Sequence, residues 1–455
     1  MNIQELIETI FKPLLDLGAS VMMPIIFIII GLCLRVKFST AVKSGLYVGV
    51  GFIGLGIVTD LLTTNLGPAV NALVAKYGLQ LSILDIGWPA AAGAAYDTSV
   101  GMLIIPACLL VNLLMLVTKT TKTINIDIWN FWHHAFIGSL VYVATGNVLW
   151  GLLAGLICFV ISLVIADFTA PSLSKFYDNM DGISIPQPFC AAYVPFAVAI
   201  NKLLDMIPGI NKIDIDAEGL KKKFGLLGEP IFLGVIIGSG LALLAGYDIP
   251  KTLKLGVIMG AVMELIPRVT RLFIDGLIPI SEATKKIVDK KFTKSSGFYI
   301  GMSPALVIGH PTTLVVSLLL IPAILFLSIV LPGNKFLPLT SLAGLLYIFP
   351  LVLPITKGNV LKTFIVGLLM LVLGNYLITG LAMVFTEVVL ASESYKQVVP
   401  TDTLVGSIDF TGSPLNWVIY QLMNLKAPGI IALTLSTLAL VYSNRKRNVL
   451  IKKIK

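Results

Sequence analysis

Charged side chains are scarce in this chain of 455 residues. Asp, Glu, Lys and Arg make up only 13% of it, roughly half the share found in soluble domains. The chain holds three histidines and four cysteines, and their spacing matches neither a metal site nor a CxxC redox motif. It also lacks the GxxxxGK[ST] loop that binds nucleoside triphosphates. We therefore expect neither a metal nor a cofactor, and we interpret the cysteines as small core residues.

Apolar residues dominate the composition instead. They make up 56% of the chain, and the mean hydropathy is +0.94. The longest apolar runs cover residues 21–34, 47–58, 100–117, 148–166, 231–245, 314–331, 360–373 and 430–441. Several approach the roughly 20 residues that a helix needs to cross a bilayer. Because the runs are continuous rather than alternating, they predict an all-α polytopic protein embedded in a lipid bilayer.

Basic residues are distributed unevenly between the predicted spans. In an arrangement of about eleven transmembrane helices that begins outside the cell, most of the 33 Lys and Arg residues fall on one side. Basic loops stay on the cytoplasmic side of a membrane, so we expect an outside N-terminus and a cytoplasmic C-terminus. The same bias explains the net charge of +9 without nucleic acid as a partner. The amphipathic opening of the chain does not resemble a cleavable signal peptide.

Two parts of the chain resemble each other. The segment "GNVLWGLLAGL" from Gly146 matches "GNVLKTFIVGL" from Gly358, and residues 85–106 match residues 299–322. This similarity predicts two copies of one five-helix unit, inverted relative to each other because each holds an odd number of spans. The first repeat is expected at 1–168, with scaffold helices at about 15–65 and core elements at about 85–168, and a cytoplasmic amphipathic linker follows at 169–229. The second repeat is expected at 230–385, with scaffold helices at about 230–275 and core elements at about 296–385. An extracellular loop at 386–429 and a C-terminal helix with a basic tail at 430–455 complete the chain.

The matched segments 85–99 and 299–313 are poor helix formers, because each mixes glycine, proline and hydroxyl residues. Irregular backbone at membrane depth is tolerated only where protein or a water-filled cavity covers it. Paired interruptions in two repeats are the best sequence indication of a substrate site. We therefore expect two re-entrant hairpins that meet near the middle of the membrane, with ordinary kinked helices as the alternative.

Histidines occur at two of these boundaries. His310 lies in the second hairpin, and His133 and His134 begin an apolar run. Ionisable groups within a membrane usually mark a transport pathway or a binding site. Adjacent residues on a helix are about 100° apart, so only one of the pair can face inward. We expect His133 to do so and His134 to have a structural role at the interface.

Many segments, in order along the chain, resemble the galactitol-type IIC component of bacterial phosphotransferase systems. They include "DIGWP", "NIDIWNFWHHAFIG", "GISIP", "PRVTRLFIDGL", "GHPTTLVVSLLLIP" and "SPLNWVIYQ", and the likeness covers about residues 15–445. That family is similar in fold to the ascorbate IIC transporters. The resemblance implies eleven spans, a core domain with re-entrant hairpins, a scaffold domain that forms a homodimer, and an elevator-type movement in the bacterial cytoplasmic membrane.

The resemblance also implies a function. A polyol enters from outside, and a separate cytosolic IIB protein, supplied with phosphate by IIA, transfers phosphate to it from a phosphocysteine. The chain would then be the membrane component of a sugar phosphotransferase without a phosphorylated residue of its own. The alternative is an ion- or proton-coupled carrier for a small polar solute, which would need no phosphate donor.

Residues that match the family's motifs form the expected substrate site. They are Gly54, Gly56, Asp85, Gly87, Trp88, Pro89, Tyr96, His133, Gln187, Ser303, Pro304 and His310. Two positions depart from the pattern, since relatives often have an acid in place of Ser303 and a histidine in place of Gln187. The general base expected for the attacking hydroxyl would then be His133, His310 or Asp181.

Overall fold

The computed structural model describes residues 19–78, 81–178, 180–213, 229–291 and 297–454, together with Ile215, Ala217, Glu218 and Gly225. The amphipathic opening and most of the charged segment at 219–228 lie outside the described residues. The first half contains α2 (Ala19–Cys33), α3 (Phe38–Tyr77), β1 (Ile83–Asp85), α4 (Gly87–Tyr96), α5 (Ser99–Val117), β2 (Thr123–Asn125), η1 (Ile128–Phe131), α6 (Trp132–Thr145), α7 (Val148–Phe176), β3 (Ile183–Ser184), α8 (Pro188–Asp205) and η2 (Ile210–Lys212).

The second half follows a similar order. It contains α10 (Pro230–Ala245), α11 (Ile249–Lys291), β4 (Tyr299–Gly301), η5 (Pro304–Leu306), α12 (Pro311–Val330), η6 (Ser341–Ile348), α13 (Leu353–Thr356), α14 (Val360–Leu390), η7 (Lys396–Val398), β5 (Leu404–Gly406), α15 (Ile408–Thr411), α16 (Pro414–Asn424) and α17 (Lys426–Ile454).

Six helices in the described ranges are long and apolar enough to cross a membrane. They are Phe38–Val58, Ser99–Val117, Val148–Phe176, Pro311–Val330, Val360–Leu390 and Lys426–Asn448. The helices at Ser20–Cys33 and Ile231–Ala245 are apolar but shorter. The helical, polytopic class expected from the sequence is therefore confirmed, while the count of eleven spans stays a prediction.

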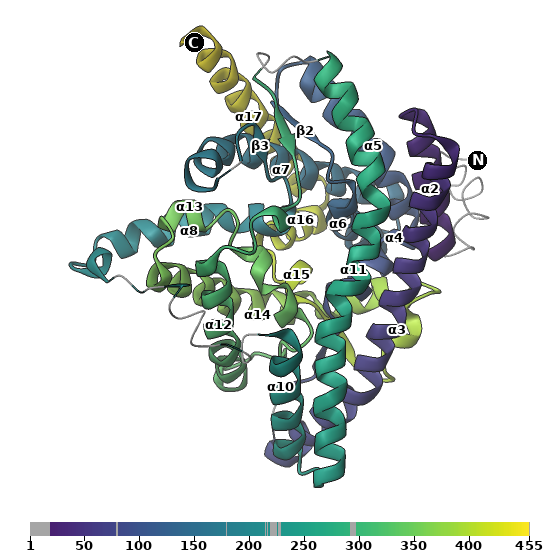
Figure 1. Ribbon diagram of the computed structural model, residues 1–455, viewed down its shortest axis with the longest axis vertical. Helices are drawn as coiled ribbons and strands as arrows, with labels where there is room; N and C mark the ends of the chain where they lie inside the picture. Colours follow the sequence, from purple (N-terminus) through teal and green to yellow (C-terminus); the bar gives the residue numbers. More distant parts are fainter. Residues whose placement is uncertain are drawn as a thin grey trace.

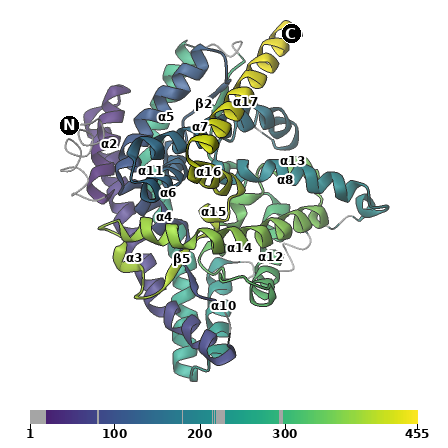
Figure 2. The same cartoon turned by 180° about the vertical axis from the view of Figure 1, so that it is seen from behind.

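The long helices α3 and α11 run side by side along one flank of the molecule, with α2 and α10 packed against them (Figure 1). The remaining helices and all the described strands form the larger body beside this flank. Figure 2 shows α14 crossing that body, and α17 leaving it toward the C-terminus. Helices α4, α6, α14 and α16 meet inside the larger body, and the polar residues of the candidate site lie in that region.

The matched "GN" dipeptides start two long helices. Gly146 and Gly358 have φ of +65° and +72°, a left-handed conformation that glycine adopts without strain. The next residues, Asn147 and Asn359, accept hydrogen bonds from backbone N–H groups in the first turns of α7 and α14. This is the usual role of asparagine at a helix N-cap. The similarity between the two segments thus has a local structural cause.

Within the described ranges, five short strands form two parallel sheets, and none of these strands was predicted from the sequence. In one sheet, β4 lies between β2 and β3. In the other, β1 pairs with β5, and Ile83 also forms a bridge to Phe336. Strands of two or three residues are too short to show an alternating pattern. All pairings are parallel, so the carboxyl ends of the strands in each sheet lie at one edge.

Two segments expected to lie outside the repeats contain ordered elements. The segment 386–429 forms β5, α15 and α16, and residues 405–410 are buried. In the segment 169–229, α7 continues to Phe176, and residues 188–194 of α8 are buried in the core. Each segment also contributes one strand to a sheet, β3 or β5. On which side of the membrane they lie stays a prediction.

Candidate functional site

Polar residues follow all three strands of the β2–β4–β3 sheet. Asp127 comes two residues after β2, Gln187 three residues after β3, and Ser303 two residues after β4. Asn125 and Ser184, near the ends of the outer strands, both stand opposite Gly301 of β4. Because the strands are parallel, the three polar residues emerge at the same edge of the sheet.

A chain of hydrogen bonds connects the side chains at this edge. The amide nitrogen of Asn130 donates to Oδ2 of Asp127 at 2.5 Å. Nε2 of Gln187 lies 3.4 Å from Oδ1 of Asn130, and the thiol of Cys190 donates to Oε1 of Gln187 at 2.8 Å. An ionised carboxylate can only accept, so Asp127 fixes the orientation of the Asn130 amide, and that amide fixes the orientation of Gln187.

His133 joins the same cluster through its backbone neighbour. Its Nδ1 lies 3.0 Å from the carbonyl oxygen of Asn130. A carbonyl oxygen only accepts hydrogen bonds, so Nδ1 carries the proton, and Nε2 of the neutral ring is an acceptor. The ring stacks on Trp132 with 3.7 Å between centroids. His133 is 2% exposed, and the adjacent His134 is buried as well, so the inward position expected for His133 alone stays a prediction.

The second sheet approaches this cluster from the other side. Trp88 lies beyond the end of β1 and Phe410 beyond the end of β5. Their rings lie 6.5 Å and 6.4 Å from that of Trp132. The carboxyl edges of the two sheets thus meet around Trp132, whose ring lies near those of Trp88 and Phe410. We define these residues as the edge cluster: Trp88, Asp127, Asn130, Trp132, His133 and Gln187.

Asp85 and its neighbours hold the β1 edge in place. The Asp85 carboxylate is fully buried and accepts hydrogen bonds from the backbone N–H groups of Gly87, Leu339 and Ser341 and from the Ser341 hydroxyl. Gly87 has φ of +69°, and a Cβ there would lie 2.6 Å from the side chain of Thr340. Only glycine combines that backbone conformation with so close an approach.

Tyr96 and Pro89 belong to the same hairpin helix, α4, and both are buried. The Tyr96 hydroxyl is hydrogen-bonded to the backbone of Trp132, and its ring packs edge-on to Phe52 of α3. Tyr96 therefore connects the edge cluster with the flank formed by α3. Near β4, Ser303 accepts a hydrogen bond from the N–H of Ala305, and Pro304 is the buried first residue of η5.

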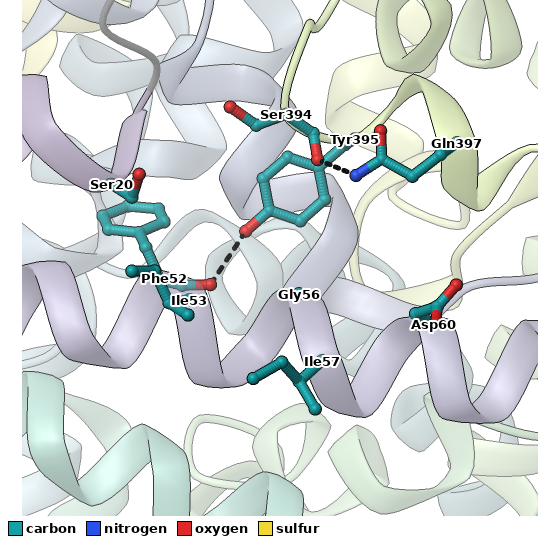
Figure 3. Close-up of a pocket in the computed structure, with 9 residues that line it drawn as sticks. All are labelled: Ser20, Phe52, Ile53, Gly56, Ile57, Asp60, Ser394, Tyr395 and Gln397. Atoms are coloured by element: carbon teal, nitrogen blue, oxygen red, sulfur yellow. Dashed lines mark hydrogen bonds between the residues drawn. The ribbon is translucent and has the colours of Figure 1, made fainter.

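A groove of about 430 Å³ lies away from the edge cluster. It opens between the start of α2, the middle of α3 and residues 394–397 (Figure 3). The Tyr395 hydroxyl crosses it to donate to the carbonyl oxygen of Phe52 at 3.3 Å. Gly56 and Asp60 line the groove, whereas none of the edge cluster does. We place the candidate site at the edge cluster, because polar and aromatic groups converge there as they do in small-molecule sites.

Known proteins match nearly the whole chain. The family model described as "PTS system sugar-specific permease component" (EIIC-GAT) matches residues 13–397. This chain belongs to the EIIC-GAT family. The permease is 36% identical, over 96% of its length and 99% of the relative's, to a protein of Escherichia coli (strain K12) named as a permease IIC component. It is 33% identical, over 91% of both chains, to the galactitol-specific EIIC component of the phosphotransferase system from the same strain.

Some expected site residues of this EIIC-GAT member lie apart from the edge cluster. His310 caps α12, where its Nδ1 accepts a hydrogen bond from the N–H of Thr312 at 3.2 Å, and its ring packs against Phe176 and Tyr177. Asp181 is exposed on the turn before β3, at the opposite end of that strand from Gln187. Gly54 packs against Val269 of α11. The structure therefore gathers only part of the expected set.

His134 of the permease is buried inside the protein. Its exposed fraction is 1%, and its ring packs edge-on to Phe131 and Phe159. Among the described residues, nothing forms a hydrogen bond with its Nδ1. This packing fits a structural role, and the position of His134 at the membrane interface stays a prediction.

Sequence reasoning missed three members of the edge cluster, Asp127, Asn130 and Trp132. Asp127 and Asn130 lie in the short segment between β2 and α6, where no periodic pattern marks the backbone, and Trp132 is the first residue of α6. The adjacent histidines drew attention to the segment but not to the polar residues before them. Within the described ranges, no group of His, Cys, Asp and Glu side chains could hold a metal ion.

Proposed function

We propose that this permease imports a sugar alcohol and releases it in the cytoplasm as a phosphate ester. The observation that carries the proposal is the 33% identity, over 91% of both chains, to a galactitol-specific EIIC component. The site chemistry supports the same ligand class. A neutral polyol needs donors, acceptors and an aromatic surface rather than a paired charge, and the edge cluster offers amides, an imidazole and two indole rings.

Within this proposal, the edge cluster binds the polyol. Nε2 of His133 accepts a hydrogen bond from one hydroxyl, and Gln187 contacts another. Trp88 and Trp132 face the carbon skeleton. Gly87, Pro89 and Tyr96 shape the first hairpin, and Ser303 and Pro304 shape the second. Gln187 replaces the histidine common in relatives, so the preferred polyol of this chain can differ from galactitol.

We also propose that the chain contains two inverted repeats. Helices α2, α3, α5 and α7 and strands β1 and β3 correspond in order to α10, α11, α12, α14, β4 and β5. The strand pairing supports this correspondence. β4 lies between β2 and β3, just as β1 lies between the bridge at Phe336 and β5. Each sheet would thus take its central strand from one repeat and its outer strands from the other. The repeats would extend over 19–205 and 230–424, whereas the expected repeats, 1–168 and 230–385, end earlier in the chain.

The proposed movement is of the elevator type. The flank of α2, α3, α10 and α11 would be the scaffold, and the larger body would carry the substrate across the membrane. A row of exposed apolar residues on α3 supports this role, because such a face suits lipid or a second copy in a homodimer. The row contains Leu46, Val50, Ile53 and Ile57, which are 56–64% exposed and recur at helical spacing. The N-terminus would lie outside and the C-terminus in the cytoplasm.

The partner in this account is a cytosolic IIB protein whose phosphocysteine is recharged by IIA. The experiment uses the purified full chain in vesicles, a panel of radiolabelled polyols, and phosphorylated IIB either inside the vesicles or omitted. We expect the internal product to be a polyol phosphate that forms only with IIB. Accumulation of free polyol in response to an ion gradient would contradict the proposal and indicate a coupled carrier.

A further inference from the structure

The acidic residues around the two sheets differ in the number of hydrogen bonds that their carboxylate oxygens accept. Asp85 accepts four hydrogen bonds. Asp167, at the amino end of β2, accepts from Thr121, Lys122, Thr123 and Asn444. Both carboxylates are therefore occupied in holding backbone segments together.

Asp409 follows β5 and Asp127 follows β2, each at the carboxyl edge of its sheet. Asp409 is 4% exposed, and its Oδ2 accepts from the Ser407 hydroxyl at 3.3 Å. Its Oδ1 lies so close to Gly344 that a Cβ there would come within 2.2 Å of it, which leaves little room for a ligand. Asp127, in contrast, is partly exposed, and only its Oδ2 accepts a hydrogen bond from a described residue.

We propose that Oδ1 of Asp127 accepts the proton from the polyol hydroxyl that becomes phosphorylated. The inference rests on the proposed function, since it concerns the same site and the same reaction. Among the polar side chains at this edge, the hydroxyl of Ser303 cannot take up that proton near neutral pH, whereas a carboxylate can. Asp127 and Ser303 follow β2 and β4, which are paired strands, so the two positions belong to one edge.

The step balances in the following way. The S–P bond of the partner's phosphocysteine breaks while a bond forms between phosphorus and the polyol oxygen. The hydroxyl proton passes to Oδ1 of Asp127, and the cysteine leaves as a thiolate with the electron pair of the S–P bond. After the polyol phosphate has left, Asp127 returns its proton to water. Phosphoryl transfer depends mainly on positioning and charge, and a general base adds about 10²–10⁴-fold to a rate.

The hydrogen-bond chain keeps the acceptor oxygen aimed at the substrate. The amide nitrogen of Asn130 donates to Oδ2 of Asp127, Gln187 donates to Oδ1 of Asn130, and Cys190 donates to Oε1 of Gln187. Because the amide of Asn130 must present its nitrogen to the carboxylate, the chain can run in only one direction. Oδ2 is therefore occupied by Asn130, and Oδ1 is left for the incoming hydroxyl.

The test compares the full-length chain with the variants Asp127→Asn and Asp127→Glu. Asp178→Asn is the matched control, because Asp178 is an exposed acid just before β3. Two quantities are measured in nanodiscs: polyol affinity by calorimetry without a phosphate donor, and single-turnover transfer of ³²P from phosphorylated IIB to the polyol across a pH series. In Asp127→Asn, the amide oxygen still accepts from Asn130 and the amide nitrogen still donates to a polyol oxygen.

We expect Asp127→Asn to bind the polyol within about threefold of wild type but to transfer phosphate about 100-fold more slowly or worse. Its remaining rate should not fall at low pH, whereas the wild-type rate should, and Asp127→Glu should recover part of the loss. Transfer by Asp127→Asn within about tenfold of wild type would overturn the inference. Loss of polyol binding in both variants would also overturn it, because Asp127 would then hold the substrate or the fold. If the wild-type chain forms no polyol phosphate, the proposed function itself fails.

Discussion

Ser341 donates two hydrogen bonds to the carboxylate of Asp85, one from its backbone N–H to Oδ2 at 2.8 Å and one from its hydroxyl to Oδ1 at 2.7 Å. Both residues are fully buried. The pair joins the end of β1 to the start of η6, which lies in the other half of the chain. Asp85 therefore connects the two halves at the edge of a sheet, beside the residues that we propose to bind the polyol.

Replacing Asp85 by Asn should destabilise the protein. The amide nitrogen would face backbone N–H groups, so buried donors would lose their acceptor at a cost of about 2–4 kcal/mol. The measurement is the free energy of unfolding in detergent, or the apparent Tm if unfolding is irreversible. The exposed Asp178→Asn variant provides the control for the change in charge. An unchanged Tm would contradict the structural role assigned to this carboxylate.

Gly93 and Tyr395 form a tight contact between α4 and the segment that contains η7. A Cβ on Gly93 would lie 2.1 Å from the Tyr395 ring, so Gly93→Ala must displace that ring. We expect Gly93→Ala to cost about 1–3 kcal/mol through overpacking, and Tyr395→Phe only about 1 kcal/mol through loss of the bond to Phe52. Thermal unfolding of the two variants checks the order. Equal Tm values for wild type and Gly93→Ala would show that the contact is not present in solution.

His133 offers a test that separates structure from binding. In His133→Asn the side-chain nitrogen can still donate to the carbonyl of Asn130, but the acceptor at the position of Nε2 is lost. We expect this variant to keep the wild-type Tm and to bind the polyol about tenfold to 100-fold more weakly, or about 1.4–2.7 kcal/mol. Calorimetry gives the affinity. In His133→Gln, in contrast, we expect a lower Tm rather than weaker polyol binding. Weaker polyol binding in His133→Gln together with a lower Tm in His133→Asn would contradict the proton assignment on Nδ1.

Asp167 connects the C-terminal helix to the start of β2. Its Oδ2 accepts a hydrogen bond from the hydroxyl of Thr121, which precedes β2, and another from the side-chain amide of Asn444 on α17. In Asp167→Ala, both partners lose their acceptor, so α17 should open more often. Hydrogen exchange over residues 436–448 should become at least about fivefold faster, which corresponds to about 1 kcal/mol. If hydrogen exchange over residues 436–448 is unchanged in Asp167→Ala, contacts other than the one between Asp167 and Asn444 hold α17 in place.

The helical membrane class could be predicted from the sequence because continuous apolar runs leave few alternatives. The similarity between the segments at Gly146 and Gly358 was also visible, since both begin with glycine, asparagine, valine and leucine. That only His133 of the adjacent pair faces the site stays a prediction, because both histidines are buried. Each of these inferences depends on residues close together in the chain.

The strands and the edge cluster could not be predicted in the same way. β1 pairs with β5 across more than 300 residues, as the register of Ile83 with Leu404 shows, and no local pattern encodes such a pairing. Asp127 and Asn130 were missed because their importance depends on which strands lie beside β2. The burial of the segment around Asp409 was not predicted either, because it depends on the pairing of β5 with β1.

The location of the polyol tests the account most directly. We would determine the structure of the full-length permease in nanodiscs with a bound polyol by electron cryo-microscopy. The account predicts ligand density between Trp88 and Trp132, within hydrogen-bonding distance of Asp127, His133 or Gln187. Density in the groove between Gly56, Asp60 and Tyr395, with the edge cluster empty, would contradict it.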